Sequence, residues 1–140
     1  MNYTQEFNQI MENTANIALA TSVNNIPNVR IVNFCYDVTK PGIAYFSTVR
    51  DNPKISEFEK NEKVAFTTIP NEGNAHIRTT KAIVQKSKLP MDDVKNLFLA
   101  QVPGFDETLS EIGELLDVFE IHIKEARIIL DVYQEGTISF

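Results

Sequence analysis

The sequence is poor in the residues that build metal sites, disulfides and nucleotide-binding loops. It holds one cysteine and two histidines, too few for a closed zinc site of the usual type, and one cysteine forms no internal disulfide. Its five glycines form no glycine-rich phosphate loop, which excludes the Rossmann and P-loop routes to a nucleotide. A bound phosphate would therefore depend on side chains and a helix end.

The sequence also lacks an excess of basic residues and any long apolar run. It carries 13 Lys and Arg against 19 Asp and Glu, giving a formal net charge of −6 and a pI near 4.9. Nucleic acids and anionic membranes are bound by basic patches, so neither is an expected partner. No apolar run approaches the roughly 20 residues of a membrane span, and no signal-peptide pattern opens the chain. We expect a cytoplasmic protein.

Many short apolar segments separated by turn residues predict a mainly β or α+β closed sheet in a single domain over residues 1–140. Hydrophobic spacing and β-propensity predict strands at Ile17–Thr21, Val29–Tyr36, Ile43–Thr48, Val64–Ile69, His76–Lys86, Val118–Ile123 and Ala126–Val132. Helical spacing predicts helices at Tyr3–Asn13, from Pro53, from Met91 and at Leu109–Leu116.

The helix from Pro53 has a strong N-terminal signal. Asn52 is a preferred N-cap and proline is favoured at the first helical position, so the helix should open at Asn52. Its free amides then point back toward the preceding loop and attract anions. The spacing buries Phe58 and turns Glu57 to water.

Two cationic residues are expected near the start of this helix. Arg30 is inside the second strand and Lys54 in the first helical turn, so a hairpin can bring them together although they are distant in sequence. Ser47 and Thr48 add hydroxyls at the end of the third strand. Either cation alone would be an ordinary surface side chain. Together with the helix end, these residues predict a pocket for a phosphate group.

The strand from Val29 to Tyr36 has two largely apolar faces. Arg30, Val32, Phe34 and Tyr36 share one face and the alternate residues share the other. Because neither face is cleanly polar, we expect one side in the core and the other covered by a ligand or a second subunit.

The order of these segments resembles the pyridoxamine 5'-phosphate oxidase-like, FMN-binding split-barrel family. R-x-V-x-F from Arg30 is followed by Y-F-S-T, by the step from Thr48 to Lys54, and by a helix ending in K-N-E-K-V-A-F. The likeness is strongest from Ile17 to Phe66. It implies one FMN-binding domain, mainly β in the α+β class: a six- to seven-stranded antiparallel Greek-key split β-barrel with short flanking helices.

The resemblance also implies a set of cofactor-binding residues. Arg30 and Lys54 match the family's phosphate-binding cations, and two facing strands match the positions that line the flavin ring. The full set is Arg30, Ile31, Val32, Asn33, Phe46, Ser47, Thr48, Asn52 and Lys54. No catalytic residue and no metal ligand is assigned.

The implied function is that of a homodimeric FMN-dependent oxidoreductase acting on a small-molecule substrate. Ala75 and Thr80 replace a ring-contacting Gln and a Gly of the vitamin B6 oxidases, and no substrate-binding Arg/His pair follows Arg127. Oxidation of pyridoxamine phosphate is therefore not expected. A flavin-binding or sensor module without turnover, and a relative that binds haem or a deazaflavin in the same cleft, remain alternatives. A Cys35/His76 nucleophile pair is conceivable, although an apolar strand favours packing for that cysteine.

Overall fold

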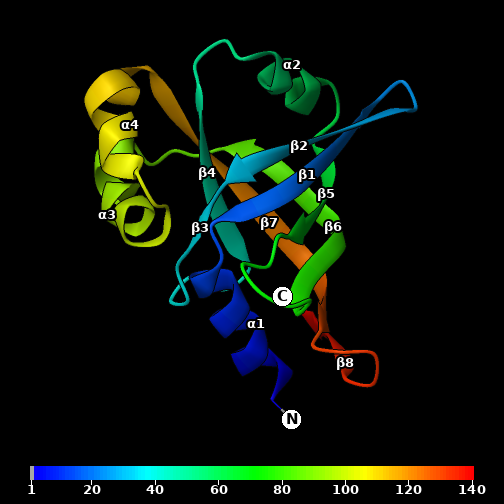
Figure 1. The fold of residues 1–140 in the computed structure, drawn as a ribbon. Helices are drawn as coiled ribbons and strands as arrows, with labels where there is room; N and C mark the ends of the chain where they lie inside the picture. Colours follow the sequence, from blue (N-terminus) through cyan, green and yellow to red (C-terminus); the bar gives the residue numbers. More distant parts are fainter. Residues whose placement is uncertain (1) are drawn as a thin grey trace.

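The computed structural model describes residues 2–140, which form an antiparallel sheet curled into a split barrel with four α-helices around it (Figure 1). This confirms the predicted fold class. The strands are β1 Asn16–Val23, β2 Ile26–Asn33, β3 Cys35–Tyr36, β4 Ile43–Val49, β5 Lys63–Thr68, β6 His76–Lys86, β7 Leu116–Ile129 and β8 Glu135–Ser139. The helices are α1 Tyr3–Asn13, α2 Pro53–Lys60, α3 Met91–Gln101 and α4 Phe105–Ile112, followed by the 3-10 turn η1 Gly113–Leu115.

The split of the barrel lies between β2 and β4. The strands follow the order β2-β1-β5-β6-β7-β4-β3, and β8 pairs with β7. The ends of this path curl toward each other, so β2 and β4 are in contact across the split. Helix α2 lies over one end of the barrel and α1 over the other, with α3 and α4 together on one flank (Figure 1).

The β1–β2 hairpin turns at Asn24 and Asn25, which both adopt positive φ, 54° and 64°. Two successive left-handed residues match the twist of a two-residue hairpin, and asparagine tolerates this conformation better than most residues. This turn joins the first two predicted strands. It fixes a register in which Arg30 pairs with Leu19, and Asn28 with Thr21.

The predicted strand from Val29 to Tyr36 is wrong in one respect, because it breaks at Phe34. The Phe34 amide donates to the Ala15 carbonyl at 3.0 Å, and the next two residues pair with β4 instead of β1. The chain therefore crosses from one edge of the split to the other at this point. The strand continues as the short β3.

The predicted pair of strands around Lys124 and Glu125 is also wrong. Both residues lie inside the single long strand β7, where irregular register with β6 lets the strand continue. The turn comes later, where Asp131 Oδ1 accepts from the amides of Tyr133 and Gln134 at 2.7 and 2.9 Å. The sheet consequently gains β8 and has eight strands, where the sequence predicted six to seven.

The last predicted helix, Leu109–Leu116, starts too late in the chain. Helix α4 opens at Phe105, directly after Gly104 at φ 78°, and its end tightens into η1. A glycine takes this left-handed conformation at little steric cost. No helix within residues 2–140 combines the length and the apolar character that crossing a membrane demands.

Two apolar cores hold these layers together. The larger fills the barrel, where Phe46 stacks on Phe119 with ring centroids 5.5 Å apart. The smaller lies between the sheet and the α3–α4 pair and contains Cys35. Burial strongly raises the pKa of the Cys35 thiol, which keeps it protonated. Cys35 is therefore a packing residue, as an apolar strand favours.

Candidate cofactor site

The start of α2 is built as the sequence predicts. Asn52 adopts extended dihedrals and its Oδ1 accepts from the Lys54 amide at 3.0 Å, with Pro53 at the first helical position. The Asn52 amide donates to the Val49 carbonyl at 3.0 Å, which ties the helix start to the end of β4. Asn52 thus fixes the direction of the helix N-terminus, and its side-chain oxygen accepts the capping hydrogen bond.

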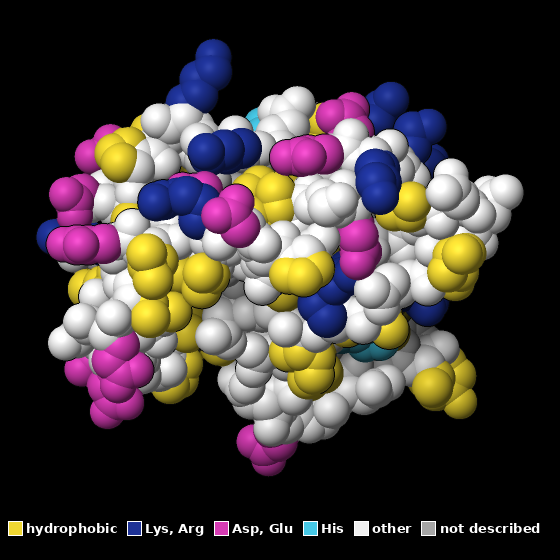
Figure 2. Space-filling view, turned by 90° about the horizontal axis from the view of Figure 1, so that it is seen from above, with side chains coloured by type: hydrophobic (Ala, Val, Ile, Leu, Met, Phe, Trp, Pro, Cys, Tyr) yellow, Lys and Arg dark blue, Asp and Glu magenta, His cyan; other side chains and the backbone are white. Residues whose placement is uncertain are grey.

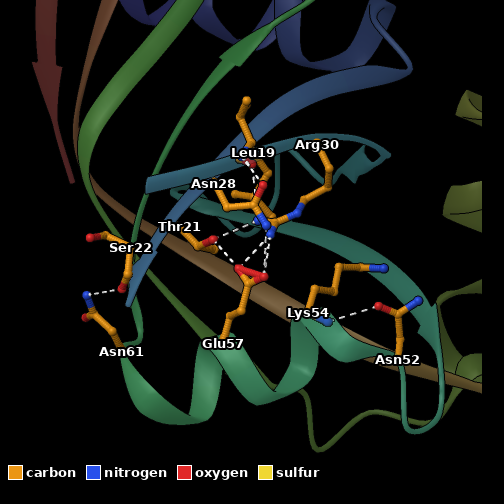
Figure 3. A network of polar contacts seen from close by, with 10 residues as sticks. Leu19, Thr21, Ser22, Asn28, Arg30, Asn52, Lys54, Glu57 and Asn61 are labelled. Atoms are coloured by element: carbon orange, nitrogen blue, oxygen red, sulfur yellow. Dashed lines mark hydrogen bonds and ion pairs between the residues drawn. The ribbon is translucent and has the colours of Figure 1, made fainter. Parts of the chain in front are cut away.

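Arg30 extends from β2 toward α2 and is held there by hydrogen bonds (Figure 3). Its Nη2 donates to the two oxygens of Glu57 at 2.9 and 2.6 Å. Its Nη1 donates to Thr21 Oγ1 at 3.0 Å and to the Leu19 carbonyl at 3.4 Å. The Arg30 side chain is 20% exposed, and its Nε makes no hydrogen bond within residues 2–140.

Glu57 is the partner of Arg30, so the prediction that it faces water is wrong. Its side chain is 24% exposed and also accepts from the Thr21 hydroxyl and from Asn28 Nδ2, the latter at 3.1 Å. The Thr21 hydroxyl, then Arg30 and Asn28, lower the pKa of this carboxyl. Glu57 is therefore ionised at neutral pH.

Lys54 is the second cation of the site. It is half-buried, and the ion pairs found within residues 2–140 do not include it. Burial, and secondly the nearby charge of Arg30, lower the pKa of its ammonium group. The two predicted cations lie beside the same polar network, Arg30 on β2 and Lys54 on α2 (Figure 3).

The facing strand β4 supplies a hydroxyl without a partner. Thr48 is only 4% exposed, and its Oγ1 is a buried side-chain atom with no hydrogen bond to any described residue. Such a group normally has a partner, because burying a polar atom unpaired costs free energy. Ser47 is half-buried on the other face of the strand, whereas Phe46 is fully buried in the barrel.

The remaining predicted residues lie on the two faces of β2. Val32 is buried in the barrel core, whereas Asn33 and Ile31 point outward, with Ile31 66% exposed. Exposed Val29 continues the apolar outer face. The structure thus places Arg30 and Lys54 beside the same polar network between β2 and α2, puts Thr48 near the end of β4 ahead of the α2 start, and leaves the outer residues of β2 uncovered.

The surface around this site is electrically mixed. Figure 2 looks onto the barrel end that carries α2 and shows Lys and Arg side chains interspersed with Asp and Glu. A hollow of about 490 Å³ lies elsewhere, on β6 and β7, with His122 in its lining. His122 Nε2 lies 2.8 Å from Glu120 Oε1, and His76 Nδ1 lies 2.7 Å from the Asn74 carbonyl oxygen. Both histidines are thus engaged on β6 and β7.

Sequence reasoning missed Glu57 and the two polar residues that hold it. The signal for Glu57 was present, because it lies three residues after Lys54 and so on the same helix face. Thr21 and Asn28 form a directly paired position of the β1–β2 hairpin. Their contact with α2 depends on how the helix packs over the split, which local spacing does not indicate.

Residues 10–135 match the family described as pyridoxamine 5'-phosphate oxidase-like. This match spans most of the chain, and the protein belongs to that family. No curated protein matches the chain.

Solved structures share the fold at low sequence identity. A Clostridium acetobutylicum protein related to general stress protein 26, of the pyridoxinephosphate oxidase family, has a TM-score of 0.72 at 13% identity, covering 99% of this chain and 94% of that one. A NimC/NimA family protein from the same organism has a TM-score of 0.70 at 19% identity, covering 100% and 95%. A heme binding protein from Mycobacterium smegmatis has a TM-score of 0.67 at 10% identity, covering 90% of this chain and 53% of that one.

Proposed function

We propose that the protein binds FMN at the β2–β4–α2 site and serves as an FMN-dependent oxidoreductase for a small-molecule substrate. The observations that carry this proposal are the half-buried Lys54, which forms no ion pair within residues 2–140, and the buried Thr48 hydroxyl, which has no hydrogen-bond partner among those residues. Both groups fit a phosphate ester, which brings negative charge and several acceptor oxygens.

The phosphate end fits the residues present. Lys54 supplies a charge, Thr48 supplies a donor, and the capped start of α2 supplies backbone amides that favour an anion. Arg30 adds positive charge nearby, and its Nε is free of described partners. A charge-assisted hydrogen bond contributes roughly 1.5 to 3 kcal/mol. The phosphate would therefore add to the affinity for the flavin.

The flavin ring would be held by the outer part of the site. Ile31 and Asn33 are exposed on β2, the backbone of Val32 runs between them, and Ser47 is partly accessible on β4. When bound, the flavin would supply hydride transfer, which requires no strong acid from the protein. The residues of this chain would bind and orient it.

We also propose that a second copy of the chain covers this outer face. Ile31 and Val29 are 66% and 63% exposed on an edge strand, and large exposed apolar surfaces mark contact sites. A homodimer would keep water away from the face that a flavin would present. Ile31 and Asn33, which would contact the flavin ring, are exposed in a single copy, which suits a pocket completed by a partner.

Haem is a second candidate because a protein described as heme binding shares the fold. His76 and His122, on β6 and β7, each already contact an oxygen and lie outside the network that holds Arg30. This arrangement favours a phosphate ligand over an iron ligand at the split. A flavin-binding or sensor module without turnover would use the same residues as the enzyme, and a deazaflavin could occupy the same cleft.

The absorbance spectrum of the purified protein, before and after incubation with FMN, tests the proposal. A two-band flavin spectrum that survives gel filtration is the expected result. A haem Soret band, a deazaflavin spectrum, or loss of all added FMN on the column would each contradict FMN as the ligand. Reoxidation of the reduced flavin by candidate acceptors then separates an enzyme from a binding module.

A further inference from the structure

Glu57 places a carboxylate beside the cations that would bind a phosphate. Helix α2 presents Glu57 and Lys54 on the same side, one turn apart, and Figure 3 shows the carboxylate aimed at the Arg30 guanidinium. Both carboxylate oxygens accept from Arg30, and Thr21 and Asn28 hold the same group. The carboxylate and guanidinium are therefore fixed as one unit.

This unit changes the charge that a ligand meets. Arg30 and Glu57 cancel each other, so the net positive charge at the split comes from Lys54 on α2. Strand β1 contributes two neutral groups to the network, the Thr21 hydroxyl and the Leu19 carbonyl. A phosphate bound near Lys54 would be attracted by two cations and repelled by one anion. At short distances these charge–charge interactions are not fully screened by salt.

We propose that Glu57 is a positioning residue that fixes Arg30 and weakens phosphate binding, so that the flavin is exchangeable rather than permanently held. The inference rests on the proposed function, since it names what sets the affinity of the same site. Arg30 is oriented without any ligand, and the repulsion by Glu57 lowers the affinity that two free cations would give.

A purely structural ion pair would behave differently. If Glu57 only stabilised α2 against β2, its removal would change binding of flavins with and without phosphate by similar factors. Repulsion instead grows with the charge of the ligand. The FMN phosphate gains its second charge near a pKa of about 6, so the effect of Glu57 should grow as the pH rises through that value.

The test is a fluorescence titration of the full-length protein with FMN and riboflavin near pH 5.5 and pH 7.5. Glu57→Gln keeps an acceptor for Arg30 but removes the charge. Glu59→Gln, at an exposed position of the same helix, is the matched control. Glu57→Asp retains the charge and tests whether the charge itself matters.

For Glu57→Gln we expect FMN to bind roughly fivefold more tightly near pH 7.5, equivalent to about 1 kcal/mol, with a smaller gain near pH 5.5. Riboflavin affinity should stay within about twofold, as should FMN affinity in Glu59→Gln, and Glu57→Asp, which keeps the charge, should not show the tighter FMN binding. Weaker FMN binding in Glu57→Gln, or equal changes for FMN and riboflavin, would overturn the role of Glu57 and leave FMN binding intact.

Inorganic phosphate separates failure of this inference from failure of the proposed function. If the wild-type protein binds no FMN, the flavin proposal is wrong, and the same variants are then titrated with phosphate by chemical-shift mapping of the Lys54 and Thr48 amides. Tighter phosphate binding in Glu57→Gln would support the role of Glu57. Unchanged or weaker phosphate binding would overturn it.

Discussion

Lys54 and Arg30 have the same formal charge but different surroundings. Arg30 is neutralised by Glu57, with which it forms an ion pair at 2.6 Å, whereas Lys54 has no carboxylate within ion-pair distance among residues 2–140. Lys54 therefore carries the charge that a ligand meets first, and Arg30 acts as a fixed donor beside it.

Lys54→Ala should weaken FMN binding by about tenfold or more, since one charge-assisted hydrogen bond corresponds to that factor. Arg30→Ala should weaken it at least as much, because the loss also leaves the Glu57 carboxylate unpaired beside the phosphate. Riboflavin should respond little to either change. Fluorescence quenching supplies the constants, with Lys60→Ala, exposed in the last turn of α2, as control. Equal FMN affinity in wild type and Lys54→Ala would remove Lys54 from the site.

The stability of the protein should depend on Glu57 in a pH-dependent way. Its folded-state pKa lies below the ordinary value, so its stabilising contribution is present above the unfolded pKa of about 4.3 and is lost as the pH falls through the lower folded pKa. Near pH 7, Glu57→Gln should therefore have a lower Tm than wild type. The difference should shrink toward about pH 3, and thermal unfolding by circular dichroism measures it. A Tm difference that is constant with pH would contradict the charge as its cause.

The N-cap residue Asn52 determines where the free amides at the start of α2 point. Asn52→Ala removes the acceptor for the Lys54 amide and should lower the free energy of unfolding by about 1 kcal/mol. Asn52→Asp keeps the cap and should remain near wild type. Urea unfolding measures both. A cap loss that leaves stability and FMN binding unchanged would mean that the helix start contributes to neither.

At the level of elements, the sequence predicts the turns and helix starts that are determined by nearby residues. The β1–β2 turn follows from Asn24 and Asn25, and the start of α2 follows from Asn52 and Pro53, because each depends on neighbouring residues alone. The break at Phe34 does not follow from periodicity, since it arises where the chain exchanges a pairing partner in β1 for one in β4.

The same distinction applies to the long strand and to the site. Lys124 and Glu125 look like a turn by composition, but pairing on both sides keeps them in β7. The two cations of the site were found from a motif, whereas the contact between Glu57 and Arg30 depends on the packing of α2 over β2. Tertiary packing of this kind can bury a residue at a helix position that spacing predicts to face solvent. The spacing of residues in a single sequence does not indicate such contacts.

For the whole molecule, the uncovered apolar face of β2 bears on assembly. Val29→Glu places a charge on that face and should shift the proposed homodimer toward monomer, whereas Val132→Glu, at an exposed position in the β7–β8 turn, should not. Sedimentation velocity at micromolar concentration compares the two variants with wild type. A wild-type monomer would contradict the dimer and the covering of the site by a partner.

The C-terminal elements bear on the substrate. Strand β8, Glu135–Ser139, carries neither the arginine nor the histidine that vitamin B6 oxidases use to hold their substrate. Pyridoxamine phosphate should therefore be turned over slowly or not at all, because orientation of a substrate supplies about 7 to 11 kcal/mol in well-ordered sites. A coupled aldehyde assay on FMN-loaded protein measures this. Rapid aldehyde formation would show that other residues bind the substrate.

The central claim is that the split between β2 and β4 binds a flavin through its phosphate. Parallel titration of the wild-type protein with FMN and riboflavin tests it most directly, because the two ligands differ only in the group that Lys54, Thr48 and the start of α2 are expected to bind. We expect FMN to bind at least about tenfold more tightly than riboflavin. Equal affinity for the two flavins, or no binding of FMN, would contradict it.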